Sequence, residues 1–346
     1  MKLSVVDQSP VSAGHTTAEA LRNTIELARL ADELGYFRYW IAEHHATAAF
    51  ASPAPEVLIA RVAAETSSIR VGSGGVMLPH YSPMKVVEQF KVLHALYPDR
   101  IDLGIGRAPG GSPLDSFALR RDRDHQPTED DFPRQLMELL AFMNHGFRPD
   151  HPFHRIDLSP EMPGGPEVWM LGSSMWSAAA AAQVGLPYAF AHFIDPVPTR
   201  QAIEYYRSHF KPSERLDKPV VVLALGAIAA DTEEEAKRLF SSVRVFGRRI
   251  RQGIRTQIPP VEEAIQELEN KSGPDRPDNG EWPRIMIGEA NDVRDRLIDM
   301  ASVLGAEEVM IVTITHDHQA RLHSYRLLAK AFGLQPRKPS APIQPS

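Results

Sequence analysis

Apolar residues recur along the chain in two alternating patterns. Short runs of β-branched and aromatic residues are typical of buried strands, and longer stretches with an apolar residue every three or four positions indicate amphipathic helices. Strands are expected at residues 2–6, 37–41, 69–77, 100–105, 167–171, 188–191, 219–228, 285–287 and 308–314. Helices are expected at residues 16–34, 53–67, 82–97, 132–143, 174–184, 199–210, 232–245, 293–304 and 317–332.

The alternation predicts an α/β protein, specifically a (β/α)8 TIM barrel. The strands are nearly continuous apolar runs, as expected for parallel strands buried on both faces. An open, doubly wound sheet obeys the same crossover rule, but about eight β-then-α units favour the closed barrel. A polar stretch at 112–131 and a proline-rich stretch at 247–283 predict insertions after strands 4 and 7. We expect one domain over 1–334 and a loosely held proline-rich tail at 335–346.

Composition narrows the classes of function. The 346 residues include no cysteine, which excludes disulfides, thiolate metal sites and cysteine nucleophiles. A net charge of −6 argues against a nucleic-acid or anionic-membrane partner. Neither a signal peptide nor a run of roughly 18 apolar residues occurs, so we expect a cytoplasmic protein. A serine hydrolase is disfavoured because no Gly-x-Ser-x-Gly elbow occurs.

Polar residues and glycines collect directly after the predicted strands. Because the carboxyl ends of barrel strands form one face of the barrel, we expect these residues to surround an active site. They are Asp7, Ser9, Glu43, His44, His45, Gly74, Gly75, His80, Gly106, Arg107, Ser173, Ser174, His192, His316, Asp317 and His318.

Two of these segments suit an anionic, flat ligand. The glycine-rich segment 104–111 is no dinucleotide fingerprint, since Pro109 replaces the last glycine, but Arg107 within it can hold an anion. Segment 171–177 runs from a strand into a helix start, where N–H groups and serine hydroxyls form a phosphate seat. A solvated arginine and a simple N-cap serine are the structural alternatives.

Two further segments have both a functional and a structural interpretation. Gly74 and Gly75 let a planar ligand approach the backbone, although a β-bulge would also explain them. His44 and His45 are adjacent and therefore point in opposite directions, so only one can face the site. A core histidine with a backbone partner is the alternative for either one.

With these motifs assembled, the chain resembles the bacterial luciferase-like flavin-dependent monooxygenases, in particular the single-chain members that open with Asp-Gln-Ser-Pro, here residues 7–10. The resemblance covers residues 1 to about 332. It is carried by four segments together: 40–45, 72–79, 99–110 and 169–174.

The resemblance implies reduced FMN as cofactor and O2 as co-substrate, reacting through a peroxyflavin that oxygenates a small organic substrate. It assigns His44 to the flavin's reactive edge, places a cis peptide at Gly74–Gly75 beneath the ring, and puts Gly106 beside it. Arg107, Ser173, Ser174 and Ser177 would hold the phosphate. Asp7, Ser9, Glu43, His45 and His192 are our candidates for contacting the substrate. A separate NAD(P)H:flavin reductase is the expected source of reduced FMN, since no nicotinamide fingerprint occurs, and the apolar helices at 55–67 and 83–97 suggest a homodimer.

Three rival functions remain open at this stage. A metal-dependent hydrolase on the same barrel could use the strand-end histidines as zinc ligands. A deazaflavin-dependent reductase of related fold is the rival within flavin chemistry. A flavin-binding barrel without catalytic activity is the third.

Overall fold

The structure is a computed structural model that describes residues 1–108, 112–119, 131–270 and 279–338. Its parallel strands are β1 (Lys2–Asp7), β2 (Arg38–Ile41), β3 (Arg70–Met77), β4 (Ile101–Gly106), β5 (Glu167–Gly172), β6 (Tyr188–Ala191), β7 (Val221–Ala230), β8 (Ile285–Glu289) and β9 (Glu308–Val312). Eight of them close into a ring in the order β1-β2-β3-β4-β5-β6-β7-β9, because β9 pairs with β1 and β6 pairs with β7. β8 pairs only with the second half of β7. The predicted barrel is confirmed.

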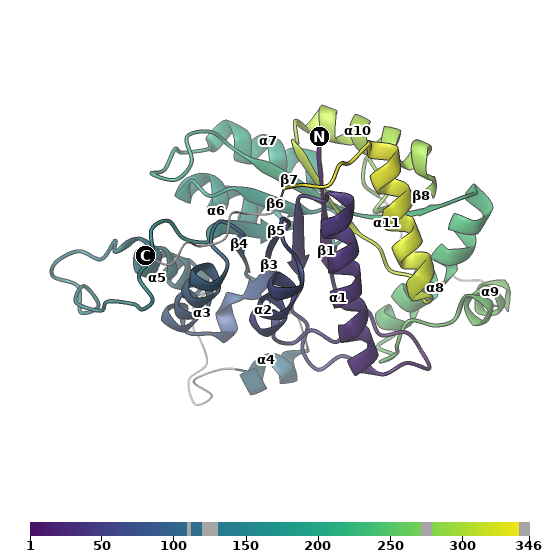
Figure 1. Cartoon of the computed structure of the whole chain (residues 1–346), viewed down its shortest axis with the longest axis horizontal. Coiled ribbons are helices and arrows are strands. Elements are labelled where there is room, and N and C mark those ends of the chain that lie inside the picture. The colour runs from purple at the N-terminus through teal and green to yellow at the C-terminus, as the bar shows by residue number, and fades with distance from the viewer. Residues whose placement is uncertain (109–111, 120–130, 271–278, 339–346) are drawn as a thin grey trace.

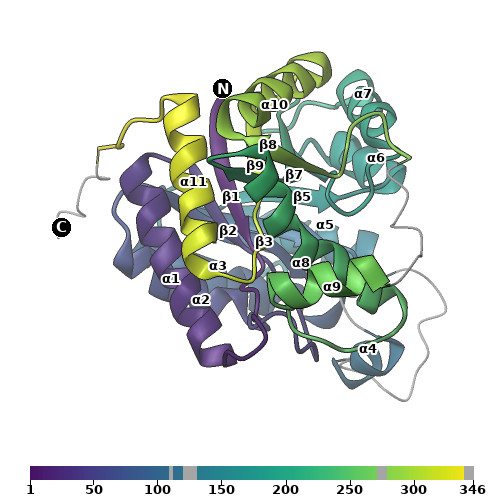
Figure 2. The ribbon, with the colours of Figure 1, turned by 90° about the vertical axis from the view of Figure 1, so that its right-hand side faces the viewer.

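Helices surround the barrel and alternate with its strands (Figures 1 and 2). They are α1 (Thr17–Leu34), α2 (Pro55–Glu65), α3 (Pro83–Leu96), α4 (Pro113–Leu119), α5 (Phe132–Asn144), α6 (Met175–Val184), α7 (Thr199–His209), α8 (Glu233–Arg251), α9 (Val261–Asn270), α10 (Ala290–Leu304) and α11 (His318–Phe332), with a short 3₁₀ helix at Leu78–His80. None of the helices in these described ranges is long and apolar enough to cross a membrane.

Local sequence explains where helices begin and end. The Thr16 side chain caps α1 by accepting a hydrogen bond from the backbone N–H of Glu19, and the Glu19 carboxylate accepts one from the Thr16 N–H. The helix ends at Gly35, whose φ of 88° lies in the left-handed region that favours glycine. A methyl group at Gly35 would also collide with the backbone of Gln335. These two capping residues therefore define the helix at both ends.

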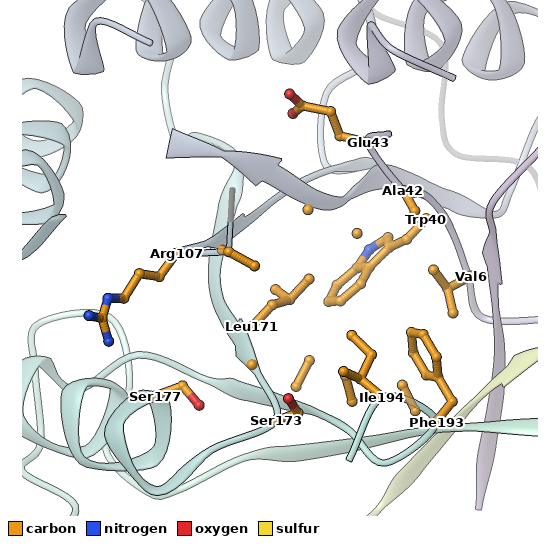
Figure 3. A pocket seen from close by; sticks show the side chains of 18 of the residues that line it. Val6, Trp40, Ala42, Glu43, Arg107, Leu171, Ser173, Ser177, Phe193 and Ile194 are labelled. Atoms are coloured by element: carbon orange, nitrogen blue, oxygen red, sulfur yellow. The ribbon is translucent and has the colours of Figure 1, made fainter. Parts of the chain in front are cut away.

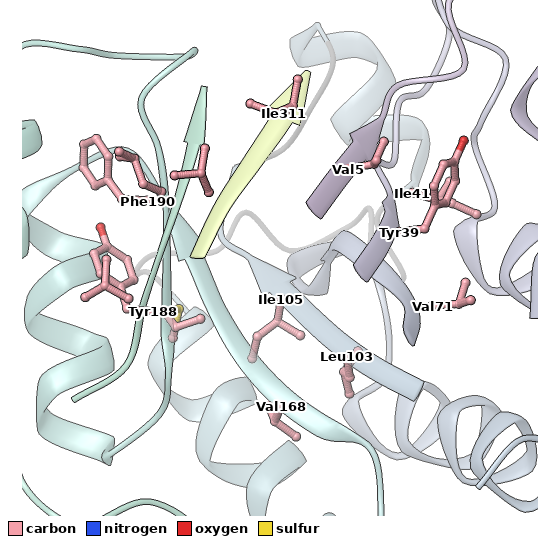
Figure 4. Close-up of a cluster of buried hydrophobic side chains, with 14 of the residues drawn as sticks. Val5, Tyr39, Ile41, Val71, Leu103, Ile105, Val168, Tyr188, Phe190 and Ile311 are labelled. Carbon is pink, nitrogen blue, oxygen red and sulfur yellow. The ribbon is translucent and has the colours of Figure 1, made fainter. Parts of the chain in front are cut away.

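Each strand has two buried faces, which explains the continuous apolar runs. The outer face packs against the helices, and its side chains, including Val5, Tyr39, Ile41 and Leu103, form the largest core cluster (Figure 4). A smaller cluster fills the barrel interior. Its buried members are Val6, Trp40, Ala42, Trp169, Ala189, Val222, Ala224, Met310 and Val312.

Charged side chains close the amino-terminal end of the barrel. The Arg38 guanidinium lies 2.8 Å from an Asp102 oxygen and 3.1 Å from a Glu308 oxygen, and Arg38 and Asp102 are almost fully buried. Ser4 donates a hydrogen bond to Glu308, and the indole N–H of Trp40 donates one to Asp102 over 2.9 Å. This network occupies the end of the barrel opposite the carboxyl ends of the strands.

The predicted insertions after β4 and β7 are present. Residues 120–130 and 271–278, within the two expected excursions, lie outside the described residues, as does the end of the tail at 339–346. The described part of the second excursion is anchored, because Ile258 donates to the carbonyl of Val11 and accepts from the N–H of Ala13. The start of the tail is also held, since Arg337 donates to the carbonyl of Phe37 and its guanidinium lies over that ring.

Candidate active site

A cavity of about 480 Å³ opens at the carboxyl ends of the barrel strands (Figure 3). It is lined by Gly106 and Arg107 at the end of β4, by serines of the β5–α6 turn, and by Trp40 and Ala42 at the end of β2. All residues predicted for catalysis or cofactor binding line this cavity: His44, Gly74, Gly75, Gly106, Arg107, Ser173, Ser174 and Ser177.

The side of the cavity at β4 and β5 is polar. The Arg107 guanidinium lies over the indole ring of Trp176, 4.6 Å from its centroid, which fixes its direction. Ser174 is the N-cap of α6 and accepts from the backbone N–H of Ser177. The Ser177 hydroxyl donates to the Ser174 carbonyl over 2.8 Å and lies 2.9 Å from the Tyr188 hydroxyl. Arginine and a helix N-terminus therefore meet at one end of the cavity.

The floor beside this polar end is bare backbone. The peptide between Gly74 and Gly75 is cis, as the resemblance implied. A methyl group on Gly75 would come within 2.7 Å of the Gly104 carbonyl oxygen, so the strands approach closely there. A methyl group on Gly106 would meet no protein atom within 4 Å. Gly106 thus presents its backbone to open cavity space.

His44 is a partly buried histidine that lines the cavity. Burial, together with the neighbouring His45, lowers the pKa of His44 to about 4. Its ring packs against Phe50 at a centroid distance of 4.4 Å, and its Nδ1 atom has no hydrogen-bond partner among the described residues. The imidazole is therefore neutral near pH 7, and one nitrogen is uncommitted.

Glu43 and His45 form a separate hydrogen-bonded cluster. His45 Nε2 lies 2.5 Å from the Glu43 carboxylate, which also accepts from the Tyr81 hydroxyl over 2.7 Å and from the Met77 N–H over 2.9 Å. Burial, followed by the Glu43 hydrogen bond and charge, raises the pKa of Tyr81. Glu43 lines the cavity, but Figure 3 shows its carboxylate directed away from the centre, and His45 is not among the lining residues.

Three residues expected at the substrate site lie elsewhere. Asp7 points to the outside of the barrel, where it accepts from Arg321 over 2.6 Å and from the Ser9 N–H over 2.7 Å. Burial would raise the pKa of Asp7, but the charge of Arg321 and the hydrogen bonds from Tyr39, Arg321 and the Ser9 N–H together outweigh it, and the pKa is lowered. The Ser9 hydroxyl accepts from Thr24. His192 is fully buried between the Thr199 hydroxyl and the Pro283 carbonyl.

Sequence reasoning missed several residues that line the cavity. Gln8 lies between the two expected residues Asp7 and Ser9, and the strand alternation that places Val6 inside the barrel could have identified it. Phe193 and Ile194 follow β6 and line the same wall, and Met310 joins them from β9. No motif marks these apolar residues in the sequence.

His316 and His318, which follow the last barrel strand, do not line the cavity. His316 Nε2 lies 3.0 Å from the carbonyl oxygen of Ala13, and His318 lies 3.4 Å from Glu26. In the described part of the chain, no three His, Asp or Glu side chains form a group that could hold a metal ion.

Together, these features define a (β/α)8-barrel protein with a ligand cavity at the carboxyl ends of its strands. The model of the luciferase-like monooxygenase family matches residues 1–314. The chain is also 42% identical over 330 residues to a luciferase-like monooxygenase of Escherichia coli strain K12, a match that covers 94% of this chain and 95% of that protein. The chain belongs to the luciferase-like monooxygenase family.

Solved structures agree with this assignment. The crystal structure of apo-MsnO8 superposes with a TM-score of 0.90 and 51% identity, covering 97% of this chain and 98% of that one. The oxygenating constituent of 3,6-diketocamphane monooxygenase from Pseudomonas putida, solved in complex with FMN, gives a TM-score of 0.69 at 18% identity and covers 99% of this chain and 100% of that one. This second likeness is one of fold.

Proposed function

We propose that this protein is an FMN-dependent monooxygenase that uses reduced FMN and O2 to oxygenate a small organic substrate. The observation that carries the proposal is the cavity itself, in which a cation and a helix N-terminus, exposed glycine backbone and a neutral imidazole line one space. Membership of the luciferase-like monooxygenase family supports it, and so does the FMN bound in the diketocamphane monooxygenase structure.

The polar end fits a phosphate group. The Arg107 guanidinium provides charge-assisted donors, and the first turn of α6 provides N–H groups and the positive end of the helix dipole. Ser173 and Ser174 add hydroxyl groups at the same place. Because the Ser177 hydroxyl is bonded to Ser174 and Tyr188, its main role is to shape this helix start.

The glycine floor fits a flat aromatic ring. Gly74, Gly75 and Gly106 expose peptide groups without side chains, so a ring can lie in contact with the backbone. Trp40 and Leu171 add apolar surface within the same cavity (Figure 3).

Reduced FMN, when bound, supplies the electrons that activate O2. The protein's own residues then have three tasks. Arg107 and the start of α6 hold the phosphate, the apolar lining limits access of water, and His44 accepts or donates a proton at the reacting edge. Because His44 is neutral, it acts first as a proton acceptor or as a neutral hydrogen-bond donor.

The proposal also includes a reductase as partner and a homodimer as assembly. Reduced FMN comes from a separate NAD(P)H:flavin reductase in the cytoplasm. A homodimer would cover the apolar surface of α2 and α3, where Val57, Val92 and Leu96 are 65%, 45% and 58% exposed. A deazaflavin in place of FMN is the remaining alternative for the cofactor.

The test is to mix oxygen rapidly with anaerobic protein that has been loaded with reduced FMN, and to follow flavin absorbance. We expect reoxidation at a rate at least tenfold different from that of free reduced FMN. His44→Ala should bind FMN as the parent does but show an altered time course. Reoxidation identical to that of free FMN at saturating protein would mean that the barrel only binds flavin. Binding of a reduced deazaflavin but not of FMN would favour the reductase instead.

A further inference from the structure

The wall of the cavity that faces the phosphate seat has a different chemistry. In the barrel ring, β1 and β9 lie diametrically opposite β4 and β5. Figure 3 shows the consequence, with Arg107 on one side of the cavity and Val6 and Phe193 on the other. A cofactor anchored at Arg107 would therefore leave this second wall for another molecule. This step rests on the proposed function.

The second wall carries no charged side chain among the described residues. It consists of Val6 and Gln8 from the end of β1, Phe193 and Ile194 after β6, Ala224 from β7 and Met310 from β9. Within the described lining of the whole cavity, Arg107 is the only lysine or arginine and Glu43 the only carboxylate, and neither belongs to this wall. A charged group placed here would lose hydration without gaining a partner.

Gln8 is the one polar side chain on this wall. Val6 lies in the barrel interior and Asp7 faces outward, so the alternation of the strand turns Gln8 inward again. Among the described residues no protein group forms a hydrogen bond with its side-chain amide. The amide can donate and accept at once, which suits a carbonyl or a hydroxyl group.

We propose that the wall formed by Val6, Gln8, Phe193, Ala224 and Met310 receives the organic substrate, that this substrate is uncharged, and that the Gln8 amide determines specificity by binding its one oxygen-containing group. A site that hydrogen-bonds one group discriminates strongly against analogues that cannot pair with it. A carboxylate would in addition be buried without a cation.

The test uses two probes of nearly the same shape, 4-phenylbutan-2-one and 3-phenylpropanoate. The carbonyl carbon carries a methyl group in the first and a negatively charged oxygen in the second. Two further ketone–carboxylate pairs with longer chains extend the series. Affinity is measured calorimetrically with FMN-loaded and with FMN-free protein. We expect the ketones to bind at least about tenfold more tightly than the matching carboxylates.

Gln8→Leu tests the residue itself, because it keeps the volume and removes the amide. We expect ketone affinity to fall by about three- to tenfold, while FMN affinity and melting temperature stay at parental values. Gln8→Glu should weaken ketone binding further, since a carboxylate cannot donate to a carbonyl. Gln201→Leu, the same substitution on an exposed face of α7, should change none of these quantities.

The outcomes separate this inference from the proposed function. Equal or tighter binding of the carboxylates, no measurable binding of any ketone, or unchanged ketone affinity in a folded Gln8→Leu variant overturns the inference while FMN binding stands. Loss of FMN binding together with a Gln8-dependent preference for ketones overturns the flavin proposal but not the assignment of the wall.

Discussion

His44 shows how one side chain couples the site to stability. Its pKa of about 4 in the folded protein lies below the ordinary value of 6.5. Between these two values the unfolded chain binds a proton that the folded protein does not, so acidification favours unfolding. The contribution of His44 is therefore fully present above pH 6.5 and is lost as the pH falls toward 4.

We predict that lowering the pH from 7 to 5 costs the parent roughly 1–2 kcal/mol more unfolding free energy than it costs His44→Gln. Urea unfolding at the two pH values measures this difference. An equal pH dependence in both proteins would mean that His44 is not held neutral by the fold.

Gly104 and Gly106 form a matched pair of residues on one strand. A methyl group at Gly104 would lie 2.2 Å from the Ser73 carbonyl oxygen, whereas one at Gly106 enters the open cavity. We predict that Gly104→Ala destabilises the fold by about 1–3 kcal/mol. Gly106→Ala should keep the parental melting temperature but weaken FMN binding at least tenfold, as measured by flavin fluorescence. Unchanged FMN affinity in Gly106→Ala would remove this residue from the ring site.

At the scale of the secondary-structure elements, a network of charged and polar side chains links the amino-terminal ends of five strands, β1, β2, β4, β5 and β9. Arg38 joins three of these strands by pairing with Asp102, Glu167 and Glu308. Asp102 also accepts a hydrogen bond from the indole of Trp40, which lines the cavity, so this amino-terminal network positions part of the site. Charged residues thus occupy the end of the barrel opposite the mouth of the cavity.

We predict that Arg38→Met costs about 3–5 kcal/mol in unfolding free energy, because it removes the arginine that pairs with the buried carboxylate of Glu308 and leaves Asp102 with Arg70 as its charged partner. Arg200→Met is the control, since Arg200 pairs with Glu281 on the surface and solvent screens that pair. Chemical denaturation of both variants decides the matter. Similar small losses of unfolding free energy in the two variants would show that the amino-terminal network does not stabilise the barrel.

The strands and helices could be predicted from the sequence because the periodicity of apolar residues that indicates them lies within each segment. Strand β6 was expected at 188–191 and is found there, and β7 was expected two residues early. That segments 104–111 and 171–177 lie at strand ends could also be predicted, and Gly106, Arg107, Ser173 and Ser174 from them line the cavity. The directions of side chains were harder to predict. The partner of Asp7 is Arg321, at the far end of the chain, so no local motif indicates that Asp7 faces outward, and only the alternation of the strand places Gln8 inside.

At the scale of the whole molecule, distant segments determine what a motif can do. His192 follows a strand as an active-site residue would, but Thr199 and Pro283 enclose it. Arg38 and Glu308 read as ordinary strand-start charges and become partners only when β2 and β9 are both in the closed ring. The wall opposite Arg107 likewise exists only in the folded barrel, since its residues come from four strands or strand ends.

The central claim is that Arg107 and the start of α6 hold the phosphate of FMN. The most direct measurement compares the affinities of FMN and riboflavin, which differ only in that phosphate, for the parent and for Arg107→Ala. We predict that the parent prefers FMN by at least tenfold and that Arg107→Ala loses most of this preference without a large change in riboflavin affinity. Equal affinities for FMN and riboflavin in the parent, or a preference that survives in Arg107→Ala, would contradict the account.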